Sequence, residues 1–272
     1  MSRTERIGFI GGGNMASAII GGLVREGLPA ANIEVVEPFA EARQRLAAQF
    51  GVQAQEQAGP ALANADLVVW AVKPQTFKDA AGAARAHTGA ALHLSVAAGI
   101  RSDSIAAWLG TERIVRSMPN TPALVGKGMT ALFARPAVTP TDRTRVEQVI
   151  ATTGEHLWVA QEQQLDAVTA LSGSGPAYVF YFLEAMRQAG AEMGLPAEQA
   201  LQLAVSTFAG AAELARASQD PPEVLRERVT SKGGTTYAAL TSLEQDQVKA
   251  LFVKALHAAE RRAAELGNEF GR

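Results

Sequence analysis

The chain begins with the stretch that most constrains its fold: a short apolar run, three consecutive glycines and an apolar helical pattern. Residues 7–10 are long enough for a buried strand, and Met15, Ile19 and Leu23 then recur at helical spacing up to Gly27. A strand, a glycine turn and a helix form the context that a dinucleotide-binding fingerprint requires. The stretch therefore predicts a Rossmann-type unit at the start of the chain.

The glycine turn matches the pattern G-x-G-x-x-A. Gly11 would permit the tight turn, Gly13 would let a pyrophosphate approach the backbone, and Ala16 would keep the helix close to the strand. The N–H groups of the first helical turn, which includes Asn14 and Met15, would face the diphosphate. We expect these five residues to bind the cofactor.

A glycine-rich turn also occurs in ordinary α/β proteins, but here the next strand, residues 33–37, ends in a carboxylate. Glu37 follows the glycines by about 20 residues, as the fingerprint requires. We predict that Glu37 accepts hydrogen bonds from the adenosine ribose and disfavours a 2′-phosphate, so that NADH is used. Arg43 or Arg45, on the following helix, would be able to rescue NADPH binding.

Composition narrows the class of protein. The chain has 272 residues, of which 47% are hydrophobic, and a net charge of −2. This allows one or two full domains and gives no reason to expect nucleic acid or an anionic membrane as a partner. Cysteine is absent, which excludes disulfides and thiolate chemistry. Residues 1–6 carry mixed charge without an apolar region, and the apolar run 177–183 is too short to span a bilayer, so we expect a cytoplasmic protein.

Strand and helix patterns alternate up to about residue 160. Strands are predicted at residues 66–72, 91–96, 114–118, 129–133 and 156–159, and helices at residues 40–50, around 105–109 and from Thr139 to near Gly154. This alternation predicts a doubly wound parallel sheet, an α/β domain over residues 1–160. Thr139, Pro140 and Asp142 form a typical helix start, with a threonine cap, proline at N1 and an acid at N3.

Strand patterns are absent after residue 160. Alanine-rich helices are predicted at residues 162–171, 176–193, 196–218 and 246–266. Residues 161–272 should therefore form an all-helical domain, and its many apolar faces favour helix–helix dimerisation.

Ligands of an open parallel sheet bind beyond the carboxyl ends of its strands. The segments expected there are residues 11–16, 71–74, 96–99 and 118–122, each of them small, polar or interrupted by proline. Four such segments at successive strand ends indicate one crevice. The further residues that we expect to bind the cofactor are Ala71, Val72, Lys73, Pro74, Ala97 and Asn120.

A second candidate site lies at Ser231, Lys232, Gly233 and Gly234, between two helical stretches. Glycines after a serine expose consecutive N–H groups that suit a carboxylate. A helix cap by Thr235 or Thr236 is the alternative, and it is compatible with such a site. The similar segment at residues 172–176 is better explained as a helix break with proline at N1.

Conventional acid–base residues are scarce. There is no lysine between Lys127 and Lys232, and the four histidines are scattered without a paired aspartate motif. Metal-ligand spacing is missing as well, so no metal is expected.

These motifs together resemble pyrroline-5-carboxylate reductases. The resemblance is carried by I-G-F-I-G-G-G-N-M-A-S-A-I-I-G-G-L from residue 7, A-V-K-P from 71, S-V-A-A-G from 95, R-S-M-P-N-T-P from 116, L-S-G-S-G-P-A-Y from 171 and T-S-K-G-G-T-T from 230. It implies reduction of 1-pyrroline-5-carboxylate to L-proline by NADPH or NADH, the last step of proline biosynthesis. It also implies a homodimer or a ring of dimers.

The resemblance assigns roles by position. Residues 11–16 and 71–74 would bind the cofactor, the backbone of residues 231–234 would bind the substrate carboxylate, and Thr236 would lie at the ring nitrogen. Glu37 departs from the pattern, because many family members have a small or phosphate-compatible residue there.

The scarcity of acid–base residues fits this chemistry. A cyclic imine can be protonated before hydride arrives, so little general acid is needed. A 3-hydroxyacid dehydrogenase, the rival enzyme, would need a lysine early in the helical domain, and none is present. A redox-sensing module that only binds NAD(P) is the non-enzymatic alternative, and it would not need the segment at residues 230–236.

Overall fold

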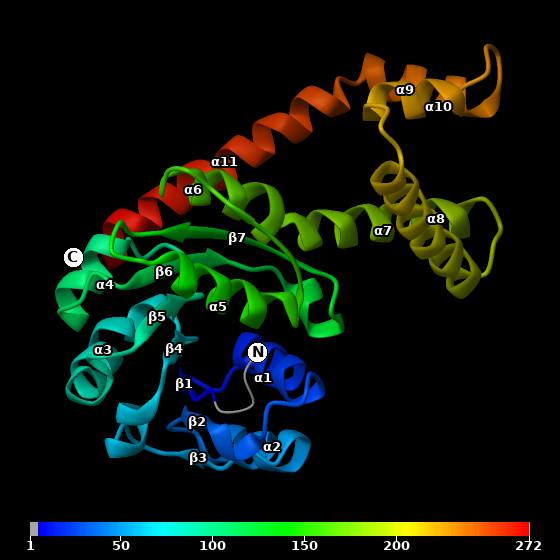
Figure 1. Cartoon of the computed structure of the whole chain (residues 1–272). Coiled ribbons are helices and arrows are strands. Elements are labelled where there is room, and N and C mark those ends of the chain that lie inside the picture. The colour runs from blue at the N-terminus through cyan, green and yellow to red at the C-terminus, as the bar shows by residue number, and fades with distance from the viewer. Residues whose placement is uncertain (1–4, 272) are drawn as a thin grey trace. The chain divides into compact units, whose positions relative to one another are not determined.

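The computed structural model describes residues 5–271, and the chain divides into two compact units (Figure 1). The first comprises the chain up to Ser174 together with the segment from Ala259 onward, and the second comprises Gly175–Ala258. The predicted division at residue 160 marks where the strand patterns end. The division by packing falls later because α6 (Gln164–Val168) packs on β6 and β7 of the first unit.

Within the described residues, eight strands form one sheet in the order β3-β2-β1-β4-β5-β6-β7-β8. They are β1 (Ile7–Ile10), β2 (Ile33–Val36), β3 (Ala54–Gln55), β4 (Leu67–Trp70), β5 (Leu92–Ser95), β6 (Ile114–Met118), β7 (Gly128–Ala134) and β8 (Gly154–Trp158). The first six strands are parallel and have the Rossmann order, which confirms the predicted doubly wound fold.

Two strands, β7 and β8, depart from the prediction of a parallel sheet. β7 runs antiparallel to β6, and β8 then pairs parallel to β7. The cause is the connection: only a short 3-10 turn, Thr121–Val125, joins β6 to β7, whereas a parallel pair needs a longer crossover, usually through a helix. The sheet is therefore mostly parallel.

Helices cover both faces of the sheet and enclose two cores. α1 (Asn14–Arg25), α2 (Ala40–Phe50) and α5 (Pro140–Ala151) contribute to the first core, and α3 (Pro74–Thr88) and α4 (Ser102–Leu109) contribute to the second. Side chains of a strand alternate between faces. Thus Leu67 and Val69 of β4 enter the first core while Val68 and Trp70 enter the second, as expected of a strand buried on both sides.

The predicted start of α5 is confirmed. The Thr139 hydroxyl accepts the Asp142 N–H at 3.1 Å, and the Asp142 carboxylate accepts the Thr139 N–H at 3.1 Å. Pro140 occupies the first helical turn, where its missing N–H costs nothing.

The second unit is helical, as predicted. It contains α7 (Gly175–Glu192), α8 (Ala197–Ala217), α9 (Pro222–Arg228), α10 (Thr235–Gln245) and the first part of α11 (Val248–Phe270). α7 and α8 pack closely, since a Cβ added at Gly190 would lie 2.6 Å from the Ala200 Cβ. The predicted helical stretches did not include α9 or α10, because the prolines and glycines around them were interpreted as separators. The helix cap considered at Thr235 or Thr236 does imply a helix that starts where α10 starts.

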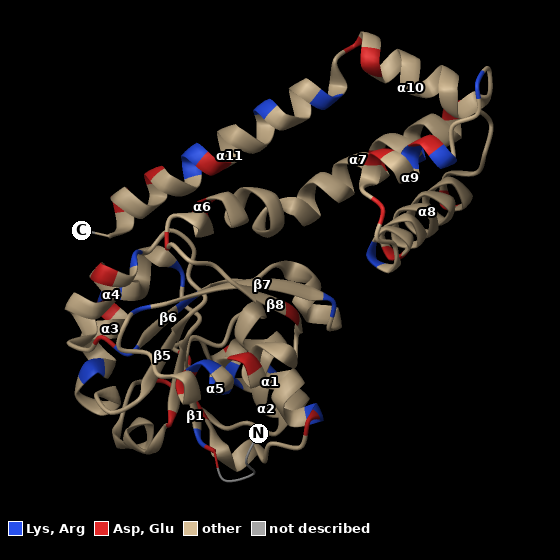
Figure 2. Ribbon diagram, turned by 45° about the horizontal axis from the view of Figure 1, so that its top comes forward, with Lys and Arg blue, Asp and Glu red and all other residues tan. Residues whose placement is uncertain are grey.

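The ribbon of α7 and α8 carries few charges (Figure 2). Large apolar side chains on these two helices are exposed: Val179, Phe180, Tyr181, Met186, Leu201, Leu203, Val205 and Leu214. An isolated unit of this kind leaves extensive apolar surface in contact with water, as expected of a surface that is covered in an assembly.

The end of α11 belongs to the first unit. Phe270 packs against the second core, and the Ser104 hydroxyl of α4 donates to the Gly271 carbonyl at 2.6 Å. None of the helices within residues 5–271 is both long enough and apolar enough to cross a membrane.

Candidate nucleotide and carboxylate sites

The turn after β1 requires glycine at position 11. Its φ is +97°, and a Cβ there would lie 2.6 Å from the Ala71 carbonyl oxygen. The Gly11 N–H donates to the Val36 carbonyl at 2.8 Å, and the Ala71 N–H donates to the Ile10 carbonyl at 2.8 Å. The turns after β1, β2 and β4 thus meet at one edge of the sheet.

The glycine turn leads into a helix N-terminus that is open to an anion. Gly13 is the exposed N-cap of α1, and a Cβ there would meet no atom within 4 Å. No side chain caps this helix, and its first turn, which begins with Asn14 and Met15, carries no acid. Ala16 is fully buried in the first core. A pyrophosphate fits here, because free N–H groups and the helix dipole face space that a side chain at position 13 would occupy.

Glu37 is buried, with 6% of its surface exposed, and each oxygen of its carboxylate holds a backbone N–H. Oε2 accepts from Gly12 at 2.7 Å, and Oε1 accepts from Phe39 at 2.8 Å. The carboxylate therefore braces the glycine turn, a role that the sequence did not predict. Each oxygen can accept a second hydrogen bond, so the carboxylate can still accept one from a ribose hydroxyl, as expected.

Two guanidinium groups lie beside this brace. Arg43 donates to the carbonyls of Glu37 at 2.9 Å and of Pro38 at 2.7 Å. Arg45 donates to the Gly12 carbonyl at 3.2 Å. The two arginines therefore bring positive charge to the Glu37 side of the turn. This is the position from which we expected Arg43 or Arg45 to rescue NADPH binding.

The turns after β4 and β5 reach the same edge of the sheet. Val72 packs close to the glycine turn, since a Cβ at Gly11 would lie 3.1 Å from its Cγ1. Lys73 is the exposed, extended N-cap of α3, and Pro74 begins that helix. Ala97, after β5, is buried, and its N–H donates to the Ser95 hydroxyl at 3.3 Å. Parallel pairing of β1, β4 and β5 thus places these predicted residues beside the nucleotide turn.

Asn120 follows β6 and is used as a connector. Its Nδ2 donates to the Ser172 carbonyl at 3.3 Å and to the Ser172 hydroxyl at 3.2 Å, and its Oδ1 accepts the Met129 N–H at 2.9 Å. Its side chain therefore joins the ends of β6 and β7 to the π-helical turn Thr169–Gly173. The sequence singled out both motifs but gave no signal that they are bonded to each other.

The second unit contains the predicted carboxylate loop. Gly233 has φ +76°, and the Gly234 N–H donates to the Ser231 carbonyl at 3.0 Å, which closes a tight turn. Gly234 is the N-cap of α10, without a side-chain cap, so neither Thr235 nor Thr236 serves as the cap. The half-buried Thr236 lies in the first turn of α10, and the exposed Lys232 lies in the loop.

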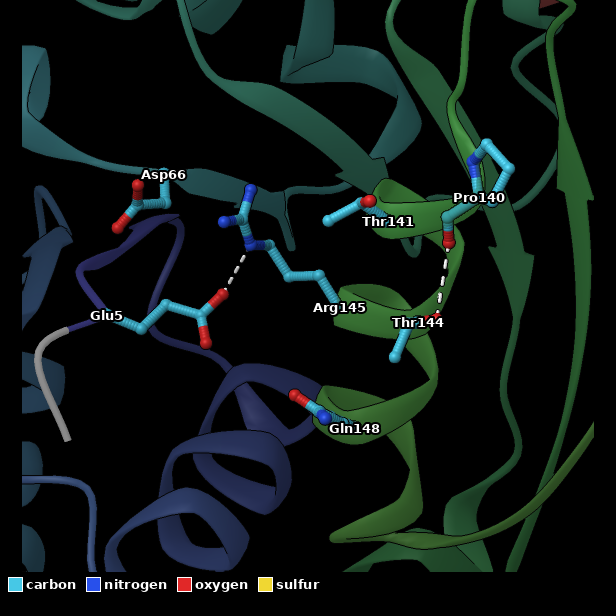
Figure 3. Close-up of a pocket in the computed structure, with 7 residues that line it drawn as sticks. All are labelled: Glu5, Asp66, Pro140, Thr141, Thr144, Arg145 and Gln148. Carbon is cyan, nitrogen blue, oxygen red and sulfur yellow. Dashed lines mark hydrogen bonds and ion pairs between the residues drawn. The ribbon is translucent and has the colours of Figure 1, made fainter. Parts of the chain in front are cut away.

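The first unit also contains a pocket of about 650 Å³ (Figure 3). Glu5, Asp66 and Arg145 are among its lining residues, and Arg145 Nε is 2.5 Å from Glu5 Oε1. Burial raises the pKa of Glu5, although Arg145 opposes this shift. Because Glu5 and Asp66 precede β1 and β4, the pocket is at the amino ends of the strands. It is therefore not the predicted nucleotide crevice.

His93 is buried in β5 and does not belong to the site. Its Nδ1 accepts the Trp70 indole N–H at 3.0 Å, and burial lowers its pKa to about 4. A histidine that is neutral at pH 7 and enclosed by the second core supplies no general acid.

Comparison with known proteins agrees with this geometry. Residues 162–266 match a family model described as pyrroline-5-carboxylate reductase dimerisation, and residues 6–99 match one described as NADP oxidoreductase, coenzyme F420-dependent.

The similarity to individual proteins covers nearly the whole chain. A pyrroline-5-carboxylate reductase of Pseudomonas aeruginosa is 46% identical, over 98% of this chain and 99% of that protein. A solved pyrroline-5-carboxylate reductase of Coxiella burnetii is 39% identical with a TM-score of 0.89, and the match covers 97% of this chain and 98% of the other. A Plasmodium falciparum pyrroline carboxylate reductase with NADP bound is 28% identical with a TM-score of 0.88, covering 98% and 100%. Taken with the nucleotide turn and the carboxylate loop, these matches show that the chain belongs to the pyrroline-5-carboxylate reductase family.

Proposed function

We propose that this protein reduces 1-pyrroline-5-carboxylate to L-proline with NADH or NADPH, as the last step of proline biosynthesis. The observation that carries the proposal is the end-to-end similarity to pyrroline-5-carboxylate reductases, which includes both the nucleotide turn and the carboxylate loop. Family membership supplies the substrate, and the geometry of the two loops supplies the roles of the residues.

The cofactor is assigned to the turns at the carboxyl ends of the strands. Gly11, Gly13, Asn14, Met15 and Ala16 form the diphosphate site, because the α1 N-terminus is uncapped and open. Gly11 shapes the turn, since its own N–H donates to the Val36 carbonyl. The neighbouring segments complete the site: Glu37 at the ribose, and Ala71, Val72, Lys73, Pro74, Ala97 and Asn120 along the crevice. Asn120 contributes chiefly by positioning the turn, since its amide is engaged with Ser172 and Met129.

The substrate carboxylate is assigned to the loop Ser231–Gly234. The α10 N-terminus has no side-chain cap and no acid in its first turn, so its N–H groups are suited to an anion. The exposed Lys232 adds positive charge to the same loop. Thr236 lies in the first turn of α10, next to this loop. Its proposed role is to hydrogen-bond the ring nitrogen of a substrate whose carboxylate is held by the loop.

The reaction needs little from the protein besides positioning. The bound dihydronicotinamide supplies a hydride when it is present. The protein holds the C=N carbon for that transfer, while the ring nitrogen, protonated beforehand, takes up the electron pair of the C=N bond and becomes an amine. Thr236 orients the nitrogen without changing its own charge, which agrees with the scarcity of acid–base residues.

Glu37 is expected to favour NADH over NADPH. Its carboxylate lies at the end of β2, where a 2′-phosphate would come close to a buried negative charge. Arg43 and Arg45 reduce this repulsion but do not remove it, because both donate to backbone carbonyls and Arg43 is also paired with the Glu56 carboxylate at 3.4 Å. NADH should therefore be used competently, with NADPH as a weaker alternative.

The assembly is proposed to be a homodimer, and further association of dimers into a ring is the finer proposal. The helical part matches a dimerisation model, and α7 and α8 expose several large apolar side chains. A permanent interface of this kind typically buries more than about 2,000 Å². We further propose that the protein is cytoplasmic.

The decisive test is oxidation of NADH or NADPH on addition of 1-pyrroline-5-carboxylate, with L-proline identified as the product. Turnover should depend on both reactants. Nucleotide binding without turnover at any substrate concentration would refute the reductase proposal and favour the redox-sensing alternative.

A further inference from the structure

Phe39 exposes an aromatic ring at the ribose end of the nucleotide turn. The residue is 73% exposed and is the N-cap of α2, directly after the Glu37–Pro38 segment. Among the described residues of the first unit, Phe39 is the one exposed aromatic side chain. A single exposed apolar side chain is common on protein surfaces, so exposure alone does not point to a ligand. What points to a ligand here is the position of Phe39, whose N–H is bonded to the Glu37 carboxylate beside the nucleotide turn.

The backbone that carries Phe39 is firmly held. Its N–H donates to Glu37 Oε1 at 2.8 Å, while the other oxygen of the same carboxylate holds Gly12 at 2.7 Å. Arg43 donates to the carbonyls of Glu37 and Pro38, and the Arg43 N–H donates to the Phe39 carbonyl at 3.1 Å. One carboxylate thus fixes both the diphosphate turn and the backbone of Phe39, and the ring is exposed from an ordered segment.

This arrangement fits one part of a dinucleotide. The diphosphate is assigned to the turn after β1 and the ribose to Glu37, so the adenine extends past the ribose on the side away from the diphosphate. Phe39 lies two residues beyond Glu37 and is bonded to its carboxylate. An aromatic face is a suitable platform for a base, because every purine has a flat π-face that stacks on it.

We propose that Phe39 is the adenine-stacking residue of the nucleotide site. This inference rests on the proposed placement of the cofactor and deepens it by assigning the adenine end. Because the contact involves only the base, it should affect NADH and NADPH alike. It is therefore separable from the charge of Glu37, which discriminates between the two.

The test is binding of nucleotide fragments to the full chain, measured by calorimetry. Phe39→Ala should weaken ADP-ribose by about 5- to 150-fold, the equivalent of about 1–3 kcal/mol for one base–aromatic stack. Affinity for reduced nicotinamide mononucleotide, which lacks adenine, should stay within about twofold of wild type by the same reasoning. Phe39→Trp should keep the wild-type affinity for ADP-ribose, and the stacked base should quench the fluorescence of the new indole.

Leu157→Ala is the matched control. Leu157 is also an exposed apolar residue, 43% exposed, but it lies in β8 at the opposite edge of the sheet from β2. Its loss should leave both fragment affinities unchanged.

Two results would overturn the inference. One is unchanged ADP-ribose affinity in Phe39→Ala, and the other is an equal loss for both fragments, which would indicate a damaged turn. A change of oligomeric state without a change of ADP-ribose affinity would assign Phe39 to a protein interface instead. Fragment binding does not require turnover, so it separates failure of this inference from failure of the proposed reductase activity.

Discussion

Replacing Glu37 should change both cofactor preference and the free energy of unfolding, and the two effects have different physical causes. The carboxylate is buried and accepts from Gly12 at 2.7 Å and from Phe39 at 2.8 Å. In Glu37→Gln the negative charge is removed while one acceptor oxygen remains, and in Glu37→Ser the whole brace is lost. The two variants therefore divide the electrostatic effect from the structural one.

The effect on cofactor preference follows from Coulomb's law. Two unit charges about 4 Å apart repel by about 1 kcal/mol in water and about 4 kcal/mol near a protein surface, which is roughly 5- to 1,000-fold in a ratio of rate constants. The neighbouring cations Arg43 and Arg45 place the expected change at the lower end of this range. Both Glu37→Gln and Glu37→Ser should raise the NADPH/NADH ratio of kcat/KM.

The effect on stability follows from burial. Gly12 is buried, so its N–H loses its partner in Glu37→Ser, whereas the exposed Phe39 can be hydrated. An unsatisfied buried donor costs about 1–3 kcal/mol, which should appear as a lower free energy of unfolding in denaturant. Glu37→Gln should lose less, because its amide oxygen can still accept one of the two N–H groups.

The assay compares steady-state kcat/KM with each nucleotide, and Glu41→Gln is the control. Glu41 is an exposed acid in the first turn of α2, so its substitution changes the net charge equally without touching the brace. A NADPH/NADH ratio that stays constant in both Glu37 variants, while stability falls, would refute the reasoning. Glu37 would then be a structural brace that does not read the ribose.

Three further predictions concern other parts of the chain. Gly11→Ala should lower the free energy of unfolding by about 1–3 kcal/mol or more, because φ is +97° and the Cβ would lie 2.6 Å from the Ala71 oxygen. Gly13→Ala has open space around the new methyl group, so this variant should keep normal stability and lose nucleotide affinity. Equal melting temperatures of the two variants would contradict this expectation. Thr236→Ala should lower kcat/KM by roughly 5- to 150-fold, the loss of one hydroxyl contact, with unchanged melting because Thr236 caps no helix; a loss beyond about 10⁴-fold would instead indicate a true acid–base residue. Burial lowers the pKa of His93 from 6.5 to about 4, so between these pH values the unfolded chain binds more protons and the free energy of unfolding should fall by up to about 3 kcal/mol as pH drops. In His93→Gln, denaturant titrations at several pH values should show a weaker dependence of this free energy on pH. An unchanged pH dependence would exclude His93 as the cause.

The parts of the fold that were predictable are those that local patterns specify. The residues of β4 are apolar on both faces of the sheet, and the capping residues Thr139 and Asp142 predict the start of α5. Both elements form where the sequence placed them. The reversal of β7 was not predictable in this way, because an isolated strand pattern has no direction. Direction is set by the length of the connection, here the short turn Thr121–Val125.

The candidate site shows the same limit at the level of single residues. The positions of Gly11 and Glu37 follow from a motif whose spacing is fixed by the strand–turn–helix geometry. The motif does not show that the Glu37 carboxylate also holds Gly12, or that the Asn120 amide is bonded to Ser172. These are contacts between residues 25 and 52 positions apart, and they depend on how turns from different strands pack together.

The two unpredicted contacts bear on how the site works. Gly12 and Ser172 lie in segments that the sequence assigned to different tasks, the nucleotide turn and a helix break. In the structure, each is tied by a buried or half-buried polar side chain to a loop at the carboxyl edge of the sheet. Such bonds hold backbone groups in place before a ligand arrives, which lowers the entropy that binding must overcome. A reductase that supplies no strong acid must rely on this kind of positioning. We therefore infer that the polar residues Glu37 and Asn120 act mainly by fixing loops, and we propose that the backbone of the nucleotide turn binds the anionic groups of the cofactor.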